Sequence, residues 1–380
     1  MTATKPSLQL LSSLTDEHVL RALMAHERLT RAELATETGI SRPTISESVR
    51  RLESTDLVRD TGARTSGRGR VGSYYALAPT VGAALVVGIA PEGVVAEVVD
   101  VRGAVLARAV RPVPHTSRAG RVRRALEAAV AQAGEKATAP AVLAVVSAAD
   151  PVDRRSGRLV HLPDSPFLIG ALDPVTVLRS NVTGPVVVDN DVNWAARAEA
   201  AAAAPGELDD FVYVHLGEGL GCAVVSDGEV RRGHHGLTGE ITHILTTGPG
   251  DRSVPLTEVF ELMGMRTAGT SAVDVAALLA RVDNGGASAR QLLGVLGAAV
   301  SGVLAAVVAL TDPRVIVIGG EWGAHPGVLA AIEESFARLP RRAPVRRARV
   351  TDEPALTGAR RHALHALQER VVARVRDSEG

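Results

Sequence analysis

One uncharged apolar stretch restricts what this chain can fold into. Residues Leu292 to Leu310 carry no charged side chain and are long enough either to cross a bilayer or to form a helix inside a protein core. Asp312 and Pro313 end the stretch, and an apolar strand, Val315 to Ile318, follows at once. A helix, a tight turn and a buried strand in that order are typical of α/β proteins, and a membrane exit requires no such strand. We therefore expect a buried helix in an α/β body, with a membrane span as the alternative.

Composition narrows the class of protein further. The chain has 380 residues, enough for roughly two or three domains, and its 42 basic and 42 acidic side chains cancel. This balance excludes a uniformly basic nucleic-acid coat but permits one local DNA-binding face. The lone Cys222 excludes a disulfide framework and any cysteine-cluster metal site. No charged-then-apolar leader opens the chain, so we expect a cytoplasmic protein.

The first eighty residues predict a separate helix-turn-helix unit. A first helix fits residues 15–27, where apolar side chains recur at helical spacing. Thr30 and Glu33 form a capping box for a second helix, which Gly39 ends. Ser41 then caps a third helix. Two short helices joined by such a turn are the pattern that many DNA-binding proteins use.

The third helix and the hairpin after it supply the candidate DNA contacts. Short hydroxyls and arginines near the start of a recognition helix suit phosphates and base edges of the major groove. Arginines in the loop between the strands that begin at Leu57 and Tyr74 predict a basic wing. The alternatives are a protein-interaction module for the helices and a solvated hairpin for the wing. The predicted DNA-binding residues are Ser41, Arg42, Thr44, Ser46, Glu47, Arg50, Arg64, Arg68 and Arg70.

The remaining three hundred residues predict a two-lobed body. Three strands, a helix and a buried strand follow one another over residues 84–146, which suggests a mixed sheet covered by helices. A second block of strands and turns begins at Phe211 and resembles the first block. An internal duplication is therefore plausible.

Four motifs stand out in the body: Asp189–Asn193, Leu216–Gly221, Arg232–His243 and Asp312–Gly320. Together they resemble the ROK family of repressors and sugar kinases, and the family's regulators also carry an N-terminal winged helix. The resemblance covers roughly residues 84–375 and implies an α/β fold class: a winged helix-turn-helix followed by a two-lobed actin-like (ribonuclease H-like) sugar-kinase fold. We expect domains at 1–80, 81–190 and 191–380, with a C-terminal helix returning to the first lobe.

The resemblance also implies a sugar site. Carboxylates accept hydrogen bonds from vicinal hydroxyls, and an amide both donates and accepts, so these residue types suit a carbohydrate. A structural alternative for Asp191 is that it caps the helix expected over 192–204. The ligand-binding residues implied by the resemblance are Asn190, Asp191, Glu240, His243 and Glu258.

Two departures from the family pattern argue against catalysis and zinc. A kinase of this family would need an aspartate in the turn after the first strand, where this chain has Ala90, and Pro91 removes an amide that phosphates would use. The family's structural zinc would need three cysteines downstream of His243, and none follows it. We therefore expect no catalytic residue, no metal and no cofactor.

Together these observations predict a cytoplasmic transcriptional regulator that is not an enzyme. Its expected partners are double-stranded operator DNA, a carbohydrate effector and a second copy of the chain, as a homodimer or a dimer of dimers, and we expect it to act as a repressor. Two alternatives stay open. One is a sugar kinase that transfers phosphate from ATP to a hexose, and the other is a DNA-binding regulator whose body is a dimerisation scaffold without a ligand.

Overall fold

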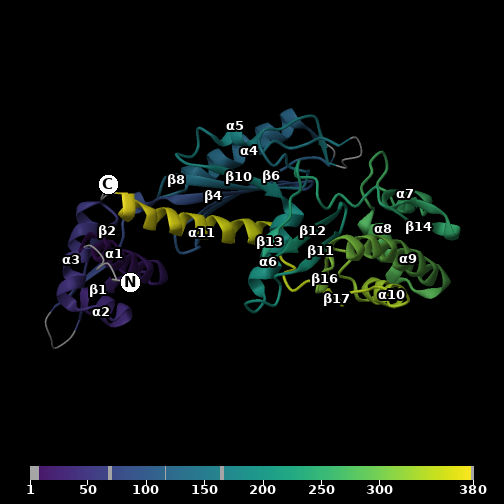
Figure 1. Ribbon diagram of the computed structural model, residues 1–380. Helices are drawn as coiled ribbons and strands as arrows, with labels where there is room; N and C mark the ends of the chain where they lie inside the picture. The colour runs from purple at the N-terminus through teal and green to yellow at the C-terminus, as the bar shows by residue number, and fades with distance from the viewer. Residues whose placement is uncertain (1–7, 67–70, 116, 163–166, 378–380) are drawn as a thin grey trace.

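The computed structural model describes residues 8–66, 71–115, 117–162 and 167–377, and it shows an elongated α/β molecule (Figure 1). A small helical unit with a three-stranded sheet occupies one end, and two lobes built on five-stranded sheets follow it. This architecture confirms the predicted fold class. The division at residues 80 and 190 stays a prediction.

The N-terminal unit is a winged helix. Its sheet has the order β1-β3-β2 and packs beside three helices. The predicted capping box is present, with the Thr30 amide donating to Glu33 and the Glu33 amide donating to Thr30, and Gly39 is left-handed at φ 70°. The first helix begins earlier than predicted. The elements are α1 (Leu8–Ala25), β1 (Leu29–Thr30), α2 (Arg31–Thr38), α3 (Arg42–Ser54), β2 (Val58–Arg64) and β3 (Ser73–Leu77).

The first lobe is a sheet of order β10-β8-β4-β5-β6 that is covered on both faces. Alternate residues of β4 enter different apolar clusters: Leu85 and Val87 pack with α4, and Ala84 and Val86 pack with α11. The elements are η1 (Pro79–Val81), β4 (Ala83–Ala90), β5 (Gly93–Val99), β6 (Val105–Pro112), β7 (Ser117–Arg118), α4 (Ala119–Glu135), β8 (Ala141–Ala148), β9 (Leu168–Ile169), α5 (Pro174–Leu178) and β10 (Val186–Asn190).

The second lobe repeats the plan with a sheet of order β13-β12-β11-β16-β17. Val212 and Val214 of β11 face α9, while Phe211 and Tyr213 face α6. The elements are α6 (Asp191–Ala202), β11 (Phe211–Leu216), β12 (Leu220–Ser226), β13 (Glu229–Val230), β14 (Leu245–Thr247), η2 (Pro249–Asp251), β15 (Ser253–Pro255), α7 (Leu256–Leu262), α8 (Val275–Asp283), α9 (Gly286–Thr311), β16 (Val315–Gly319), α10 (Pro326–Phe336), β17 (Val345–Arg347) and α11 (Pro354–Asp377).

Helix α9 contains the uncharged stretch that opened the sequence argument. By length and composition it could cross a membrane, but 56% of its most apolar window is buried inside the protein. It packs along α10 and beside β14, and β16 follows it directly. This is the helix, turn and buried strand that the sequence predicted.

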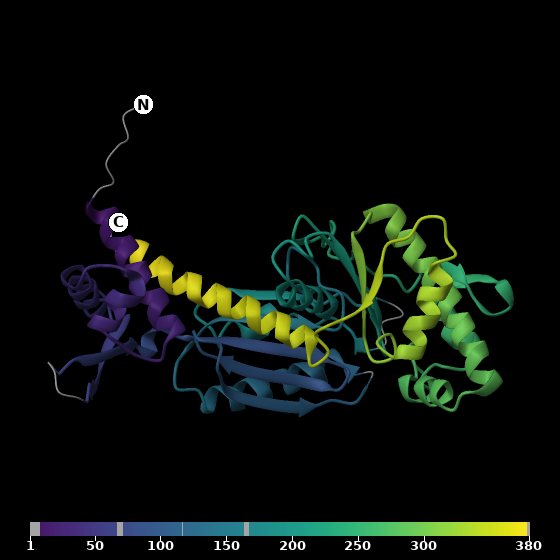
Figure 2. The same ribbon diagram turned by 90° about the horizontal axis from the view of Figure 1, so that it is seen from below.

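The last helix, α11, connects the parts of the molecule. It runs lengthwise from the second lobe, across the first-lobe sheet, to the winged helix (Figure 2). One apolar cluster contains side chains from α1, β4 and α11, among them Leu20, Val86 and Val372. Ion pairs add to this contact, because Arg21 lies 3.0 Å from Glu369 and Arg376 lies 2.7 Å from Glu17. The winged helix is therefore packed against the body rather than only tethered to it.

Candidate functional site

The polar face of helix α3 is the candidate DNA-binding surface. Ile45, Val49 and Leu52 are fully buried and fix this helix against α1 and α2, so its opposite face points to solvent. Ser41 caps the helix and its hydroxyl lies 2.8 Å from that of Thr44. The exposed residues on this face are Ser41, Arg42, Thr44, Glu47 and Arg50, with Ser46 half-buried.

The hairpin that carries the predicted wing continues this surface. Arg64 ends β2 and pairs at 2.9 Å with Asp60, which offsets part of its charge. The Thr65 amide donates to the Gly72 carbonyl at 2.9 Å and closes the described part of the hairpin. Arg68 and Arg70 lie outside the described residues.

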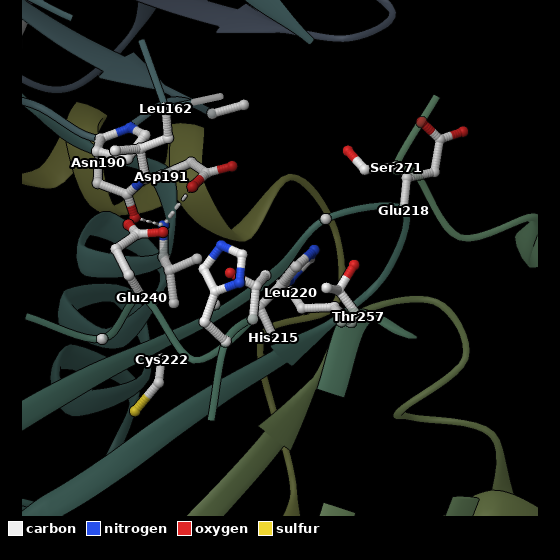
Figure 3. Close-up of a pocket in the computed structure, with 18 residues that line it drawn as sticks. Leu162, Asn190, Asp191, His215, Glu218, Leu220, Cys222, Glu240, Thr257 and Ser271 are labelled. Atoms are coloured by element: carbon white, nitrogen blue, oxygen red, sulfur yellow. Dashed lines mark hydrogen bonds between the residues drawn. The ribbon is translucent and has the colours of Figure 1, made fainter. Parts of the chain in front are cut away.

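A pocket between the two lobes brings together four of the five predicted sugar-site residues. Asn190 and Asp191 lie where β10 ends and α6 begins, and Glu240 and His243 come from the loop after β13. Figure 3 shows Asn190, Asp191 and Glu240 gathered on one side, with Glu218, Thr257 and Ser271 on the other. We call this the effector pocket. Glu258 is half-buried in the first turn of α7 and is not among the described lining residues, whereas its neighbour Thr257 is.

The start of α6 shows that capping and pocket lining go together. Asn190 is the N-cap, and its side chain accepts from the Val192 amide at 3.0 Å. The Asp191 carboxylate accepts from the same amide at 2.7 Å. Asp191 therefore serves the helix start, as the structural alternative predicted, and still lines the pocket.

Burial raises the pKa values of two pocket acids. Loss of water raises the pKa of Asp191 to about 6, although nearby His215 opposes the shift. Burial, together with the charge of Asp150, raises the pKa of Glu240 to about 7. Burial likewise raises the pKa of the Cys222 thiol to about 12, so this thiol is a poor nucleophile at neutral pH.

His215 is a pocket residue that the sequence reasoning missed. It lies at the carboxyl end of β11, and Figure 3 shows its ring rising toward Asp191. A polar side chain that ends a buried strand just before a glycine-rich turn was the available signal.

Acidic side chains occupy the region where a kinase would hold phosphates. The turn between β4 and β5 contains Pro91 and Glu92, and the glycine-rich turn between β11 and β12 contains Glu218. Burial is the main cause that raises the pKa of Glu218, and the charges of Glu92 and Glu321 add to the shift. His115 of the first lobe lies 3.3 Å from Glu218 and is the nearest compensating group that the structure gives it.

The loop that would hold zinc in this fold is held by packing. Leu256, Val259 and Phe260 are buried, and the buried Thr246 hydroxyl donates to the Ala299 carbonyl at 2.6 Å. No described group of three or more histidine, cysteine or acidic side chains could hold a metal ion. The residues present after His243 therefore do not fit a structural zinc.

Comparison with known proteins supports both halves of this description. The ROK family model matches residues 87–258, and a winged helix-turn-helix DNA-binding model matches residues 13–59. The chain therefore contains a ROK family domain preceded by a winged helix-turn-helix. The chain is 30% identical over 192 residues to the N-acetylmannosamine kinase of Escherichia coli O1:K1 / APEC. That match covers 48% of this chain and 62% of the kinase's length, so it spans only part of the relative.

Two solved structures share the fold of this ROK protein. A ROK family transcriptional regulator homologous to the E. coli MLC protein has a TM-score of 0.63 and is 18% identical, with 96% of this chain and 98% of that chain covered. The ROK hexokinase from Thermus thermophilus has a TM-score of 0.57 and is 27% identical, covering 73% and 96% respectively. The regulator match therefore extends over nearly the whole ROK protein, and the hexokinase match over about three quarters of it.

Proposed function

We propose that this ROK protein is a transcriptional repressor that binds duplex operator DNA and responds to a sugar held between its lobes. The observation that carries the proposal is the packing of α3, which buries one face completely and exposes arginines and hydroxyls on the other. A helix fixed in this way can enter a major groove without losing its position on the protein. The full-length fold match to a ROK regulator supports the same function.

The effector pocket supports a sugar as the signal. Amide, carboxylate and imidazole groups converge there from both lobes, and such groups pair with vicinal hydroxyls. Because residues of both lobes line the pocket, a bound sugar would stabilise the closed arrangement of the lobes. A ligand shifts that equilibrium only by its differential affinity for the two arrangements. The closed form would hold the DNA-binding units out of register with the operator.

Residues in and beside the effector pocket favour a body that binds a sugar without phosphorylating it. Asp191 stands where a base for a sugar hydroxyl would be needed, but the turns that would receive ATP phosphates carry Glu92 and Glu218. Pro91 also lacks the amide that a phosphate would use. We propose that the chain works as a cytoplasmic homodimer, because two winged helices can read two half-sites.

Selection of bound fragments from the source genome by the full chain tests the proposal. Specific fragments should be recovered. The genes next to them should identify candidate sugars, and one of these sugars should release the chain from the fragments. A coupled assay for ATP consumption with the same sugars tests the kinase alternative. A chain that ignores genomic fragments at low salt but turns over ATP, with turnover lost in Asp191→Asn, would refute the proposed function.

A further inference from the structure

A second cavity lies at the junction between the winged helix and the first lobe. Its volume is about 390 Å³, which falls in the range of roughly 300–1,000 Å³ that is usual for small-molecule sites. Its walls come from the end of α1, from β2 and β3, from the chain segment after β3, and from the β5–β6 and α4–β8 connections of the first lobe. Among the described residues it shares none with the effector pocket, so this junction cavity is a separate site.

Hydrogen bonds hold the walls of the junction cavity in place. The Ala78 amide donates to the Leu57 carbonyl of the winged helix at 2.9 Å. Arg374 of α11 donates to the Thr80 carbonyl at 3.0 Å, so the body also holds the segment that joins the two units. Gly82 lines the cavity in the left-handed conformation at φ 87°, and a side chain there would clash with the first lobe. The cavity is therefore a built feature of the junction and not a gap between loosely placed units.

The floor of the junction cavity is apolar. Leu23, Val81 and Val101 line it and belong to the buried cluster that joins the winged helix to the body. Leu106 of β6 also lines the cavity, although 38% of this residue is exposed. An exposed leucine in the wall of a cavity favours a ligand with an apolar body that would cover it.

The rim of the junction cavity is charged, with an excess of one positive charge. Arg28, Arg59 and Arg102 line the cavity against Glu27 and Asp100, which are three basic groups against two acidic ones. Asp100 already accepts hydrogen bonds from two backbone amides of its own turn and lies 3.4 Å from Arg102. In the described part of the chain, Arg28 and Arg59 have no acid within ion-pair distance. These two guanidinium groups are therefore available to an anion.

We propose that the junction cavity binds a small monocarboxylate with an apolar body, either an acyl chain or an aromatic ring. The carboxylate contacts Arg59 and Arg28, and the guanidinium of Arg28 lies over the Tyr74 ring at 4.8 Å from its centroid. The apolar body covers Leu106 and the floor. One negative charge matches the excess of one positive charge, whereas a phosphate carries more charge and meets the acids of the rim. The ligand contacts the winged helix and the first lobe at once.

Calorimetry on the full chain tests the proposal. The probes are octanoate, phenylacetate and benzoate, each compared with its neutral amide. At least one carboxylate should bind about tenfold or more tighter than its amide, because only the carboxylate forms charge-assisted hydrogen bonds with arginine. Excess inorganic phosphate should not displace it. The proposal is refuted if none of the three carboxylates binds, if each amide binds as tightly as its carboxylate, or if phosphate displaces the bound carboxylate.

A pair of variants on β6 locates the bound carboxylate. Leu106→Asp adds a negative charge to the cavity wall and should lower the affinity for the carboxylate about tenfold or more. Val110→Asp is the matched control, because Val110 is exposed on the same strand and is not among the described lining residues. Its affinity should stay within about twofold of the parent chain. Thermal unfolding confirms that both variants are folded, and equal effects of the two variants would contradict the site.

A second pair of variants tests the arginine contact. Arg59→Gln should lower the affinity for the carboxylate about tenfold while the affinity for the amide stays within about twofold. Arg123→Gln on α4 removes a charge outside the cavity and should change neither affinity. Titration of a genomic fragment with the same variants covers the alternative that Arg59 contacts DNA. Weaker DNA binding by Arg59→Gln with an unchanged affinity for the carboxylate would assign this arginine to a DNA phosphate and overturn the proposal.

Discussion

The acids of the effector pocket make a prediction about stability as well as binding. The pKa of Glu240 is about 7 in the folded chain against an ordinary value of 4.5, so the folded state holds this proton more tightly than the unfolded state does. The contribution of Glu240 to the free energy of unfolding therefore falls as pH rises from 4.5 to 7. Glu240→Gln should raise the free energy of unfolding at pH 8 by about 1–3 kcal/mol, with no gain below pH 4.5.

Urea unfolding at several pH values measures this effect. Asp189→Asn is the matched control, because Asp189 is paired with Arg197 and Arg232 and its loss should destabilise the chain at every neutral or alkaline pH. Stabilisation by both variants, or by neither, would contradict the contrast between Asp189, which is paired with arginines, and Glu240, whose pKa is raised by burial.

Substitution of single arginines in α3 tests the predicted contact with operator DNA. Arg42→Ala or Arg50→Ala should weaken operator binding by about 1–3 kcal/mol if the arginine reads a base, and by less if it contacts a phosphate. Arg50 is 76% exposed and only loosely paired with Glu47 at 3.8 Å, so it is available to DNA. Fluorescence anisotropy with a selected operator measures the change. Arg123→Ala, on the surface of α4, removes one charge elsewhere and should leave the affinity unchanged.

The sugar-site residues could be predicted only where their surroundings carried a motif. Asn190 and Asp191 follow a buried strand directly, and Glu240 and His243 belong to a motif whose resemblance placed them together. His215 lies in a strand of ordinary apolar pattern, and its approach to Asp191 depends on the pairing of β11 with β12 and on the position of α6. That approach is non-local, so the position of His215 just before the glycine-rich turn could mark it as a candidate, but neither spacing nor periodicity could identify Asp191 as its neighbour.

At the scale of elements, local chemistry decided what could be predicted. Helices α2 and α3 were predicted because Thr30, Glu33, Gly39 and Ser41 determine their ends within a few residues. Most strands of the two large sheets were predicted by their apolar runs, whereas the short edge strands β13 and β17 were not. The return of the C-terminal helix to the first lobe was expected from the family resemblance and not from the residues of α11, because the sheet face that receives it is about 270 residues earlier in the chain.

Helix packing at α11 gives a prediction with a matched control. Gly358 is buried against the backbone carbonyl of Trp194 in α6, so a methyl group there must move one helix away from the other. Gly358→Ala should lower the free energy of unfolding by about 1–3 kcal/mol. Gly294→Ala in α9 meets open space, and helix propensity should raise the stability by about 0.5–1 kcal/mol. Thermal unfolding of both variants checks the opposite signs, and equal effects would refute the close approach of α6 and α11.

At the scale of the whole molecule, the contacts between α1 and α11 suggest how the effector pocket and the winged helix influence each other. Asp191 begins α6, α6 packs along α11, and α11 packs against α1. The double variant Arg21→Ala/Arg376→Ala removes exposed ion pairs worth less than about 1 kcal/mol each, so the fold and the sugar affinity should persist. The effect of sugar on operator affinity should shrink.

Operator titrations with and without sugar measure that coupling. Arg338→Ala, which removes a more exposed ion pair with Glu334 in α10, is the control and should leave the coupling intact. Full coupling in the double variant would show that α11 does not transmit the response.

The position of α11 also affects the order in which the molecule can be completed during synthesis. The winged helix leaves the ribosome first and carries its own capping signals, so it can fold early. The first-lobe sheet, by contrast, lacks the cover over one face until residues 354–377 have been translated. A polypeptide that ends before that point would have a folded winged helix attached to a first-lobe sheet with one uncovered face. Protein quality control would then encounter an exposed apolar surface instead of a complete protein.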